Sequence, residues 1–519
     1  MSRVAIVGSG IGGLTAALLL SKQGQEVTVF ERASQVGGRV AFEENGPYRI
    51  DRGPTIVLLP EMLLSTLEEG GLPAGSIELL RCNPLYRVHF KSGRTLTKVD
   101  GVQEQAAEIE KSFPGEGEGF IRFMKDMSGL FPLGKAAFLE RDFKNRKAFF
   151  SLKNLSLMAR LQAFKSLRSA VGQYFHSEEL KDAYSLQSLY IGGAPFRTPG
   201  IYTMLPYAEQ AFGIWMLKGG YGELPRLMVK ELERRGVRIQ TRTEVESILV
   251  SGGRCRGVFV KGEELPFDAV LYNGDFPHLE GLLPQGVLKK GLTLRAALHQ
   301  KPSPSGTTQK EEKNQSRVKF KPSSGCLLIY IGANKRWDDS LTHQFFLPDS
   351  LNDSLKDLFD HHSIPDKPSY YVFNPVALDD SAAPAGESVL YFLIPVPNKG
   401  LIDWDAVANP LADKVLADAE ARGFPGLAGS TIWRKVRTPV DAEREGMYGG
   451  GSFGIAPVLS QSGVFRPQPK PYNIGGLYAA GASVHPGGGV PIVMQGARLA
   501  VHELMKEMRT HDRTDVVEM

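Results

Sequence analysis

Hydrophobic residues at the start of the chain follow the pattern of a βαβ unit. Residues 3–7 form a short apolar run that is typical of a buried parallel strand, and the apolar positions of residues 14–23 predict a helix. A further run over residues 26–31 predicts a second strand. Strand, helix and strand in this order predict a Rossmann-like α/β domain at the N-terminus.

The remaining chain alternates between helical and mixed patterns. Residues 101–190 predict mostly helices, and residues 301–317, which are almost entirely polar, predict a solvated insertion. The other apolar runs predict a helix over residues 224–235, strands near 237–240, 245–250, 269–272, 325–333 and 388–395, and a strand, a glycine-rich turn and a long helix over 476–508.

Composition restricts the possible classes of function. The 519 residues carry a formal net charge of only +4, so we expect no nucleic-acid partner. The cysteines Cys82, Cys255 and Cys326 are isolated from one another, which argues against a metal site and favours a reducing, cytoplasmic compartment. Glycine is abundant, with 57 residues and no Gly-X-Y period, so we expect it in turns and at close backbone contacts.

A glycine-rich turn joins the first predicted strand to the first helix. Gly8, Gly10 and Gly13 fit the G-x-G-x-x-G pattern, and Glu31 ends the next strand. In such a unit the glycines permit a tight turn, close approach to a pyrophosphate and close packing of helix on strand, while the acid binds ribose hydroxyls. Because a carboxylate disfavours a 2′-phosphate, the pattern favours the ADP-ribose of FAD or NAD over NADP.

Further glycine-rich segments favour FAD over NAD. Residues 34–39 (SQVGGR) follow Glu31 directly, and residues 51–55 (DRGPT) come next. Near the C-terminus, residues 477–483 predict a buried strand, and residues 485–491 (HPGGGVP) form a turn that opens a helix. So many glycines before a helix N-terminus indicate a ligand at that position.

Together these motifs resemble the FAD-dependent amine oxidase superfamily and, within it, the bacterial-type carotenoid and phytoene desaturases. The blocks DRGPTIVLLP, YIGG, FRPQ and GASVHPGGGVPIV look closest to the 4,4′-diapophytoene (dehydrosqualene) desaturases of the thirty-carbon pathway. The resemblance implies non-covalent FAD and cofactor contacts at Gly8, Gly10, Gly13, Glu31, Arg32, Gly38, Arg39, Gly53, Pro54, Thr55, Val245, Gly481, Ala482, Val490 and Pro491.

The resemblance also implies a division of the chain into domains. Residues 1–95, 211–290 and 441–519 are expected to build the FAD-binding domain. Residues 96–210 are expected to form a helical, membrane-associating region, and residues 291–440 a mixed-sheet substrate domain that carries the polar insertion.

The activity implied by the resemblance is desaturation of 4,4′-diapophytoene to diaponeurosporene or diapolycopene, by hydride transfer to flavin and loss of a proton. His485, in the predicted flavin turn, is the candidate catalytic residue, although a purely structural role in the turn stays open. A sister group oxidises the terminal methyl groups of the same carotenoids, and its C-terminal motif looks more like GGSVNPGGGMP. This chain has His485 in that motif, which favours the desaturase. The methyl oxidase and a forty-carbon phytoene desaturase remain alternatives.

A polyene dissolved in the bilayer requires an entry surface on the enzyme. Residues 141–170 hold eight basic residues and one acid, and Leu157, Leu161 and Phe164 have the spacing of one helix face. This pattern predicts a basic amphipathic helix on an anionic leaflet, hence a peripheral protein on the inner face of the cell membrane, with a solvated domain helix as the alternative. Quinone or oxygen is the expected electron acceptor.

Two other classes of protein remain to be weighed. A non-enzymatic prenyl carrier of the same fold could lose the flavin-facing glycines, yet this chain keeps them at both ends. A soluble amine oxidase would be expected to show an aromatic cage near the flavin, and the basic apolar segment would then have no explanation. Both classes are therefore less favoured than a carotenoid enzyme.

Overall fold

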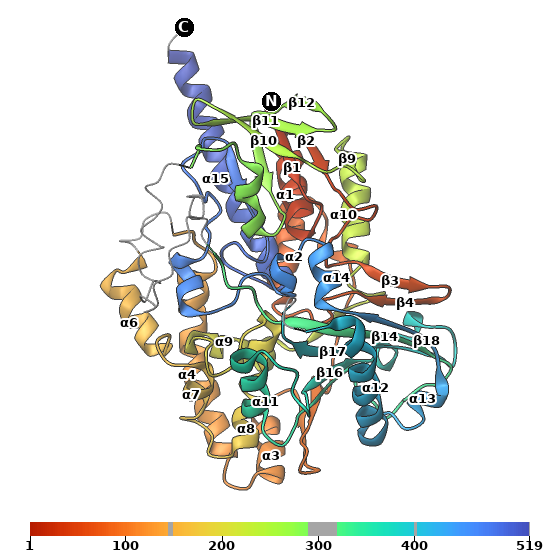
Figure 1. Cartoon of the computed structure of the whole chain (residues 1–519). Helices are drawn as coiled ribbons and strands as arrows, with labels where there is room; N and C mark the ends of the chain where they lie inside the picture. The colour runs from red at the N-terminus through yellow and green to blue at the C-terminus, as the bar shows by residue number, and fades with distance from the viewer. Residues whose placement is uncertain (144–148, 289–318, 399–401, 518–519) are drawn as a thin grey trace, which may run out of the picture.

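Strand β1 (Arg3–Val7) lies at the centre of a five-stranded parallel sheet. The computed structural model describes residues 1–143, 149–288, 319–398 and 402–517. The strand order is β19 (Leu477–Ala479), β13 (Ala269–Tyr272), β1, β2 (Glu26–Phe30) and β9 (Arg238–Gln240). The strands β1, β2, β13 and β19 are short, mostly apolar and largely buried on both faces, as parallel strands generally are, whereas the edge strand β9 is partly exposed. The five strands come from widely separated parts of the chain (Figure 1).

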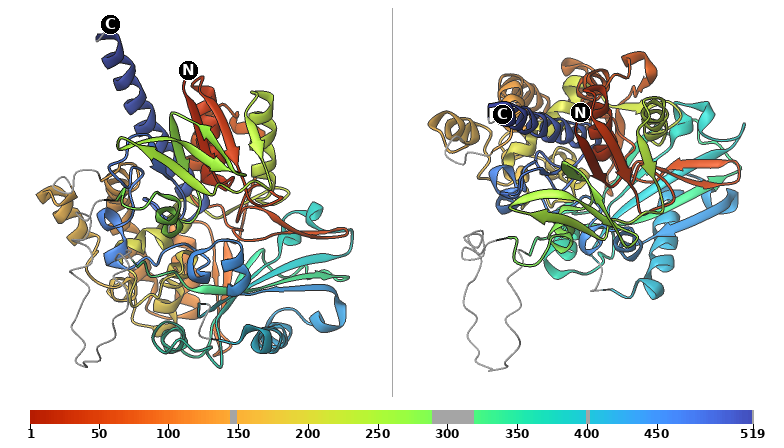
Figure 2. Two further views of the ribbon diagram at one scale, coloured as in Figure 1. Left: turned by 45° about the horizontal axis from the view of Figure 1, so that its top comes forward. Right: turned by 90° about the horizontal axis from the view of Figure 1, so that it is seen from above.

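The two faces of this sheet are covered differently (Figure 2). Val4 and Ile6 share a hydrophobic core with helices α1 (Ile11–Lys22), α10 (Glu223–Arg234) and α15 (Val490–Val517). Ala5 and Val7 point to the opposite face and pack with an antiparallel sheet of β10 (Ser247–Ser251), β11 (Arg254–Val260) and β12 (Glu263–Pro266). The alternation along β1 therefore places the parallel sheet between a helical layer and a small second sheet.

A second large sheet contains seven strands. Its order is β18 (Thr431–Arg437), β14 (Gly325–Ala333), β17 (Ser388–Val396), β16 (Tyr370–Phe373), β15 (His343–Phe346), β6 (Tyr86–His89) and β7 (Thr95–Lys98). The sheet is mixed, because β15 runs parallel to β6 while the other pairs are antiparallel. One face packs on α12 (Trp404–Arg422), and the other shares a core with the helical body.

The helical body lies beside the second sheet (Figure 1). It consists of α3 (Val102–Ser112), α4 (Gly117–Phe138), α6 (Leu152–Arg160), α7 (Leu167–Val171), α8 (Glu178–Ala183) and α9 (Met204–Phe212). Other elements are α2 (Pro60–Glu69), α11 (Leu351–Lys356), α13 (Leu427–Ser430), α14 (Pro439–Arg444), β3 (Phe42–Asn45), β4 (Tyr48–Asp51), β5 (Leu79–Arg81) and β8 (Trp215–Leu217). Within the described residues, no helix has the length and apolar character that a membrane crossing requires.

The predicted α/β class with a parallel first sheet and a mixed second sheet is confirmed. The predicted strands at 3–7, 269–272 and 325–333 have the bounds of β1, β13 and β14. The boundaries proposed for the domains stay predictions. The polar insertion at 301–317 lies outside the described residues, as do Lys144, Arg146 and Lys147 of the basic segment.

The predicted helix face of Leu157, Leu161 and Phe164 is wrong. Helix α6 ends at Arg160, and Gln162 has a left-handed backbone with φ of 51°. Both leucines are buried in the core of the helical body, whereas the side chain of Phe164 is 64% exposed. The chain reverses direction between Leu161 and Phe164, so a spacing that suits one helix does not give one face.

Two buried ionisable side chains of opposite charge type interact electrostatically, without a direct hydrogen bond, where the second sheet meets the helical body. Lys98, at the end of β7, and Glu209, in α9, are both completely buried. Glu209 Oε2 accepts hydrogen bonds from Tyr86 Oη at 2.8 Å and from Gln187 Nε2 at 3.0 Å. The ammonium of Lys98 lies 3.6 Å from the centre of the Tyr184 ring. Burial lowers the pKa of Lys98 to about 7, while the charge of Glu209 opposes that shift.

Removing either member of this pair should leave the other buried without its partner. We expect Glu209→Gln and Lys98→Met each to lower the free energy of unfolding by roughly 3–5 kcal/mol. The double variant should lose less than the sum of the two, which a denaturant titration of all four proteins measures. Strict additivity would contradict an interaction between the two side chains.

Candidate cofactor and substrate site

The turn from Gly8 to Gly13 holds α1 tightly against β1. Gly8 has φ of +99° and donates its backbone N–H to Phe30 O at 2.8 Å. A Cβ added at Gly13 would lie only 2.1 Å from the carbonyl oxygen of Gly8, so a larger residue does not fit. Gly10 is the N-cap residue of α1 and provides no side-chain cap. The first N–H groups of α1 are therefore left for a ligand.

Glu31 is fixed beside this turn by three hydrogen bonds. Its Oε2 accepts from the backbone N–H of Ser9 at 2.8 Å and from the hydroxyl of Ser9 at 2.7 Å, and its Oε1 accepts from the N–H of Ala33 at 2.8 Å. The carboxylate thus has a set position at the end of β2, where an adenosine ribose binds in dinucleotide folds.

The second glycine pair lies directly against the first turn. Gly37 donates its N–H to Ser9 O at 3.0 Å, and a Cβ at Gly38 would lie 3.3 Å from the Cα of Gly10. Arg39 extends from this pair toward Asp275, with 3.9 Å between Nη2 and Oδ2. The arginine therefore places positive charge next to the glycine turn, where phosphates are expected.

These segments line one cavity of about 1580 Å³. Of the residues predicted to contact the cofactor, all but Gly13 line it: Gly8, Gly10, Glu31, Arg32, Gly38, Arg39, Gly53, Pro54, Thr55, Val245, Gly481, Ala482, Val490 and Pro491. Gly13 lies behind the turn, where the absence of a side chain allows α1 to pack closely against β1. The structure thus brings the predicted residues together, while the contact that each makes with a cofactor stays a prediction.

Asn273 is a residue that the sequence reasoning missed at the polar end of the cavity. It follows β13 directly and donates from Nδ2 to Ala480 O at 3.1 Å. Its Oδ1 is buried and has no hydrogen-bond partner among the described residues, although it lies beside Gly10. A glycine cradle, a fixed carboxylate and an unpaired amide oxygen together fit a bound dinucleotide.

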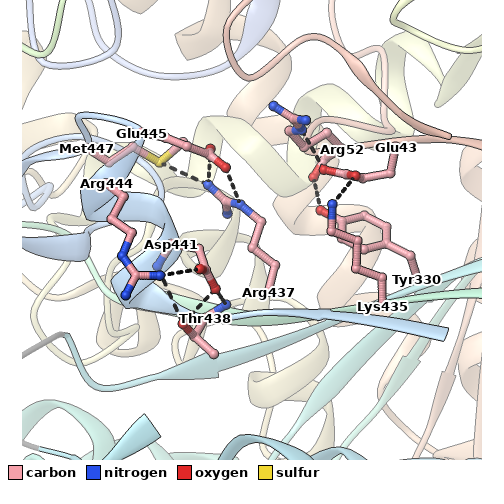
Figure 3. Close-up of polar contacts among 10 residues, drawn as sticks. All are labelled: Glu43, Arg52, Tyr330, Lys435, Arg437, Thr438, Asp441, Arg444, Glu445 and Met447. Carbon is pink, nitrogen blue, oxygen red and sulfur yellow. Dashed lines mark hydrogen bonds and ion pairs between the residues drawn. The ribbon is translucent and has the colours of Figure 1, made fainter. Parts of the chain in front are cut away.

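Two arginines at the cavity wall were also missed as site residues. Arg437, at the end of β18, is buried and donates from Nε to Glu445 Oε1 at 3.2 Å, close to Met447 (Figure 3). Arg466 is buried as well and donates to the backbone carbonyls of Ala482 and Val484 in the C-terminal turn. Arg466 belongs to the FRPQ block, which contributes to the family resemblance. The sequence therefore marked this arginine, but no binding role was predicted for it.

His485 lies at the cavity wall but points its Nε2 away into the protein. Nε2 donates to the carbonyl oxygen of Arg141 at 2.7 Å, and the ring contacts Phe143 edge-on. The opposite nitrogen, Nδ1, is buried and has no partner among the described residues. Burial lowers the pKa of His485 to about 4, so the imidazole is neutral and Nδ1 carries a lone pair of weak basicity. A catalytic role for His485 stays a prediction.

The opposite end of the cavity is apolar. It is lined by side chains from the helical body and from the second sheet, among them Phe131, Phe138, Met158, Leu189, Tyr190, Ile201, Leu328, Phe345, Tyr371, Tyr391 and Leu393. Phe150, Phe164 and Leu459 line the cavity and are also exposed on the outer surface, which places an opening of the cavity at an apolar patch. We call this apolar end of the cavity, together with its opening, the apolar arm. A cavity of this kind fits a long hydrocarbon chain.

Known proteins give a consistent result for the whole chain. Residues 11–505 match the model of the family described as flavin containing amine oxidoreductase. The chain is 44% identical to 4,4′-diapolycopen-4-al dehydrogenase of Metabacillus indicus, with 99% of both chains covered. It is 32% identical to the zeta-carotene-forming phytoene desaturase of Myxococcus xanthus (97% of this chain, 94% of that one) and 30% identical to a diapolycopene-forming 4,4′-diapophytoene desaturase of a Methylomonas species (98% and 96%).

Solved structures agree on the fold. A variant of putrescine oxidase superposes with a TM-score of 0.65 at 13% identity, covering 97% of this chain and 99% of that chain. The family match spans nearly all of the chain, from the start of α1 directly after Gly10 to α15, and it includes the C-terminal turn that lines the cavity. The protein is therefore a member of the flavin-containing amine oxidoreductase family, and FAD is its cofactor.

Proposed function

We propose that the protein is an FAD-dependent oxidoreductase of a linear thirty-carbon carotenoid. The three relatives described above, each with 30% or more identity over nearly the full chain, carry names of carotenoid enzymes. The apolar arm supports the same substrate class, because it joins the predicted flavin region to an opening among exposed aromatic and aliphatic side chains. FAD in this cavity would accept a hydride from the bound polyene.

For the reacting carbon we propose the terminal aldehyde of the polyene, which is oxidised to a carboxylic acid. One observation carries this choice: identity to the diapolycopenal dehydrogenase is 44%, against 32% and 30% for the two desaturases. In this reaction water adds its oxygen to the aldehyde carbon, a hydride leaves that carbon for the flavin, and two protons are released as the acid forms in its carboxylate state. Quinone or oxygen then takes the two electrons from the enzyme.

Desaturation of 4,4′-diapophytoene, which His485 and the HPGGGVP turn favour, is the second candidate. It requires only a hydride acceptor and an outlet for one proton, and the apolar arm would hold that substrate equally well. Methyl oxidation and desaturation of forty-carbon phytoene are further outcomes that the same experiment separates.

The purified holoenzyme should be mixed without oxygen with diapophytoene, phytoene, diapolycopene or diapolycopen-4-al in turn. We expect bleaching of the flavin with the aldehyde, and a product that has gained one oxygen atom. In ¹⁸O-labelled water that atom should carry the label, which mass spectrometry detects. Bleaching by diapophytoene with loss of hydrogen, and none by the aldehyde, would replace the proposal by the desaturase.

We also propose that the cofactor occupies the glycine-lined end of the cavity. Gly10→Val would place a branched side chain at the cavity wall, where an added Cβ already approaches Asn273 Oδ1 to 2.9 Å. We expect purified Gly10→Val protein to contain little or no FAD, as judged by the flavin absorbance. Gly129→Val is the control, because Gly129 lies on the exposed side of α4 with no atom near its added Cβ. Full flavin occupancy in Gly10→Val would contradict the assignment.

We further propose that the exposed apolar patch beside the opening touches the inner face of the cell membrane. Leu152 is 87% exposed at the start of α6, which projects from the helical body, and Phe164 follows it (Figure 1). Lys153, Arg160 and Lys165 lie in the same segment and suit an anionic leaflet. A polyene leaving the bilayer at this patch would enter the apolar arm directly.

The double variant Leu152→Glu/Phe164→Glu should bind anionic liposomes at least about 30-fold more weakly, because two large apolar side chains no longer enter the interface. Ile432→Glu is the matched control, since Ile432 is 56% exposed on β18 but does not line the cavity. Sedimentation with liposomes measures the binding. Equal binding of the double variant and the control would show that the patch does not touch lipid.

A further inference from the structure

Three side chains form a hydrogen-bonded chain that ends at the cavity wall. Thr55 Oγ1 lies 2.7 Å from Tyr371 Oη, and Tyr371 Oη lies 2.7 Å from His343 Nδ1. Thr55 and Tyr371 line the cavity, whereas His343 is completely buried behind them on β15. The chain therefore connects residues 51–55, the loop expected near the flavin, with the second sheet.

The number of hydrogens on this chain decides what Thr55 offers to a ligand. Burial lowers the pKa of His343 to about 3 and raises the pKa of Tyr371 well above its usual value, so both groups are neutral near pH 7. Each hydroxyl then carries one hydrogen, and the imidazole carries one on either Nδ1 or Nε2. Two hydrogen bonds use two of these hydrogens, and one hydrogen is left over.

The position of the leftover hydrogen follows from the tautomer of His343. With hydrogen on Nδ1, His343 donates to Tyr371, whose own hydrogen is then available to Thr55. When Tyr371 donates it to Thr55, the hydroxyl hydrogen of Thr55 is free to enter the cavity. With hydrogen on Nε2, both bonds reverse, and Thr55 donates to Tyr371 and offers only lone pairs.

The surroundings of His343 favour the first tautomer. Nε2 is buried and has no hydrogen-bond partner in the described part of the chain, and the ring stacks on Phe373 with 5.3 Å between ring centres. A buried N–H without an acceptor is rarer in proteins than a buried acceptor without a donor. The unpaired Nε2 is therefore better accommodated as a lone pair, which leaves the hydrogen on Nδ1 and directs a donor into the cavity at Thr55.

We propose that Thr55, oriented by Tyr371 and His343, donates a hydrogen bond to the carbonyl oxygen at the end of the bound polyene. This inference rests on the proposed aldehyde oxidation, because a hydrocarbon end has no oxygen to accept the bond. Much of the surrounding arm is apolar, so an oriented donor at this place would select an oxidised end group over a methyl group. Thr55 binds substrate in this scheme, and Tyr371 and His343 are positioning residues.

The test uses the holoenzyme with its flavin reduced beforehand in the absence of oxygen, so that bound diapolycopen-4-al is not oxidised, and reads the carbonyl stretching band by Raman spectroscopy. A donated hydrogen bond lowers this frequency, so we expect a lowered band in the wild type and in Thr55→Ser. In Thr55→Val, which keeps the side-chain shape but removes the donor, the band should return to that of the free aldehyde. We expect kcat/KM for the aldehyde to fall about 10- to 100-fold in Thr55→Val and to recover in Thr55→Ser.

Tyr370→Phe is the control on the same strand. The hydroxyl of Tyr370 donates to Asp418 at 2.7 Å, and its ring belongs to the opposite core of the sheet, so its loss should leave the carbonyl band unchanged. Tyr371→Phe should broaden the band or shift it partway, because Thr55 keeps its hydroxyl but loses its orientation.

The outcomes separate this inference from the proposed function. Identical carbonyl bands in wild type and Thr55→Val would overturn the inference even if the aldehyde is oxidised. A Thr55→Val protein that loses FAD, or whose flavin spectrum shifts while the aldehyde band stays low, would assign the donor to the cofactor and also overturn it. A lowered band in a wild-type enzyme that does not oxidise the aldehyde would support the subsite and refute the proposed reaction.

Discussion

The site depends on how closely helix α1 approaches strand β1. The contact exists only because Gly13 has no side chain to meet the carbonyl oxygen of Gly8. With α1 held there, the C-terminal helix α15 packs against it in the same core, and its first residue, Val490, comes to the wall of the cavity. One missing side chain thus allows both ends of the chain to face a single ligand.

The division of the cavity into a polar and an apolar end matches two very different ligands. At the polar end the charged groups are held by specific partners, as Glu31 is by Ser9 and Arg437 is by Glu445 (Figure 3). Burying such charges is costly unless they are paired, so they are also rigid. The apolar end is built mainly of rings and aliphatic side chains, which impose shape but little orientation. A polar contact within that arm is therefore a means of fixing which atom of a long chain meets the flavin.

The sequence predicted those parts of the site whose residues belong to short, continuous segments of the chain. The turn at Gly8, the acid at Glu31 and the C-terminal turn around Ala482 each carry a local pattern, and they meet at one cavity. Side chains that act through distant partners had no such pattern. His343 and Tyr371 become neighbours only through the pairing of β15 with β16, and nothing local marks the reversal at Gln162 that turns Leu161 inward. Fold class was accessible from periodicity, whereas pairing across sheets was not.

The strand order of the first sheet also constrains the synthesis of the protein. β1 can pair with β2 early in synthesis. Its other edge stays unpaired until β13 has been made, and β19, which pairs with β13, is made later still. Until α15 leaves the ribosome, the apolar residues of α1, such as Leu14 and Leu18, lack the helix that covers them. The nascent chain therefore exposes an open strand edge and an uncovered helix until β19 and α15 have been synthesised, and both are sites at which it could associate with other chains.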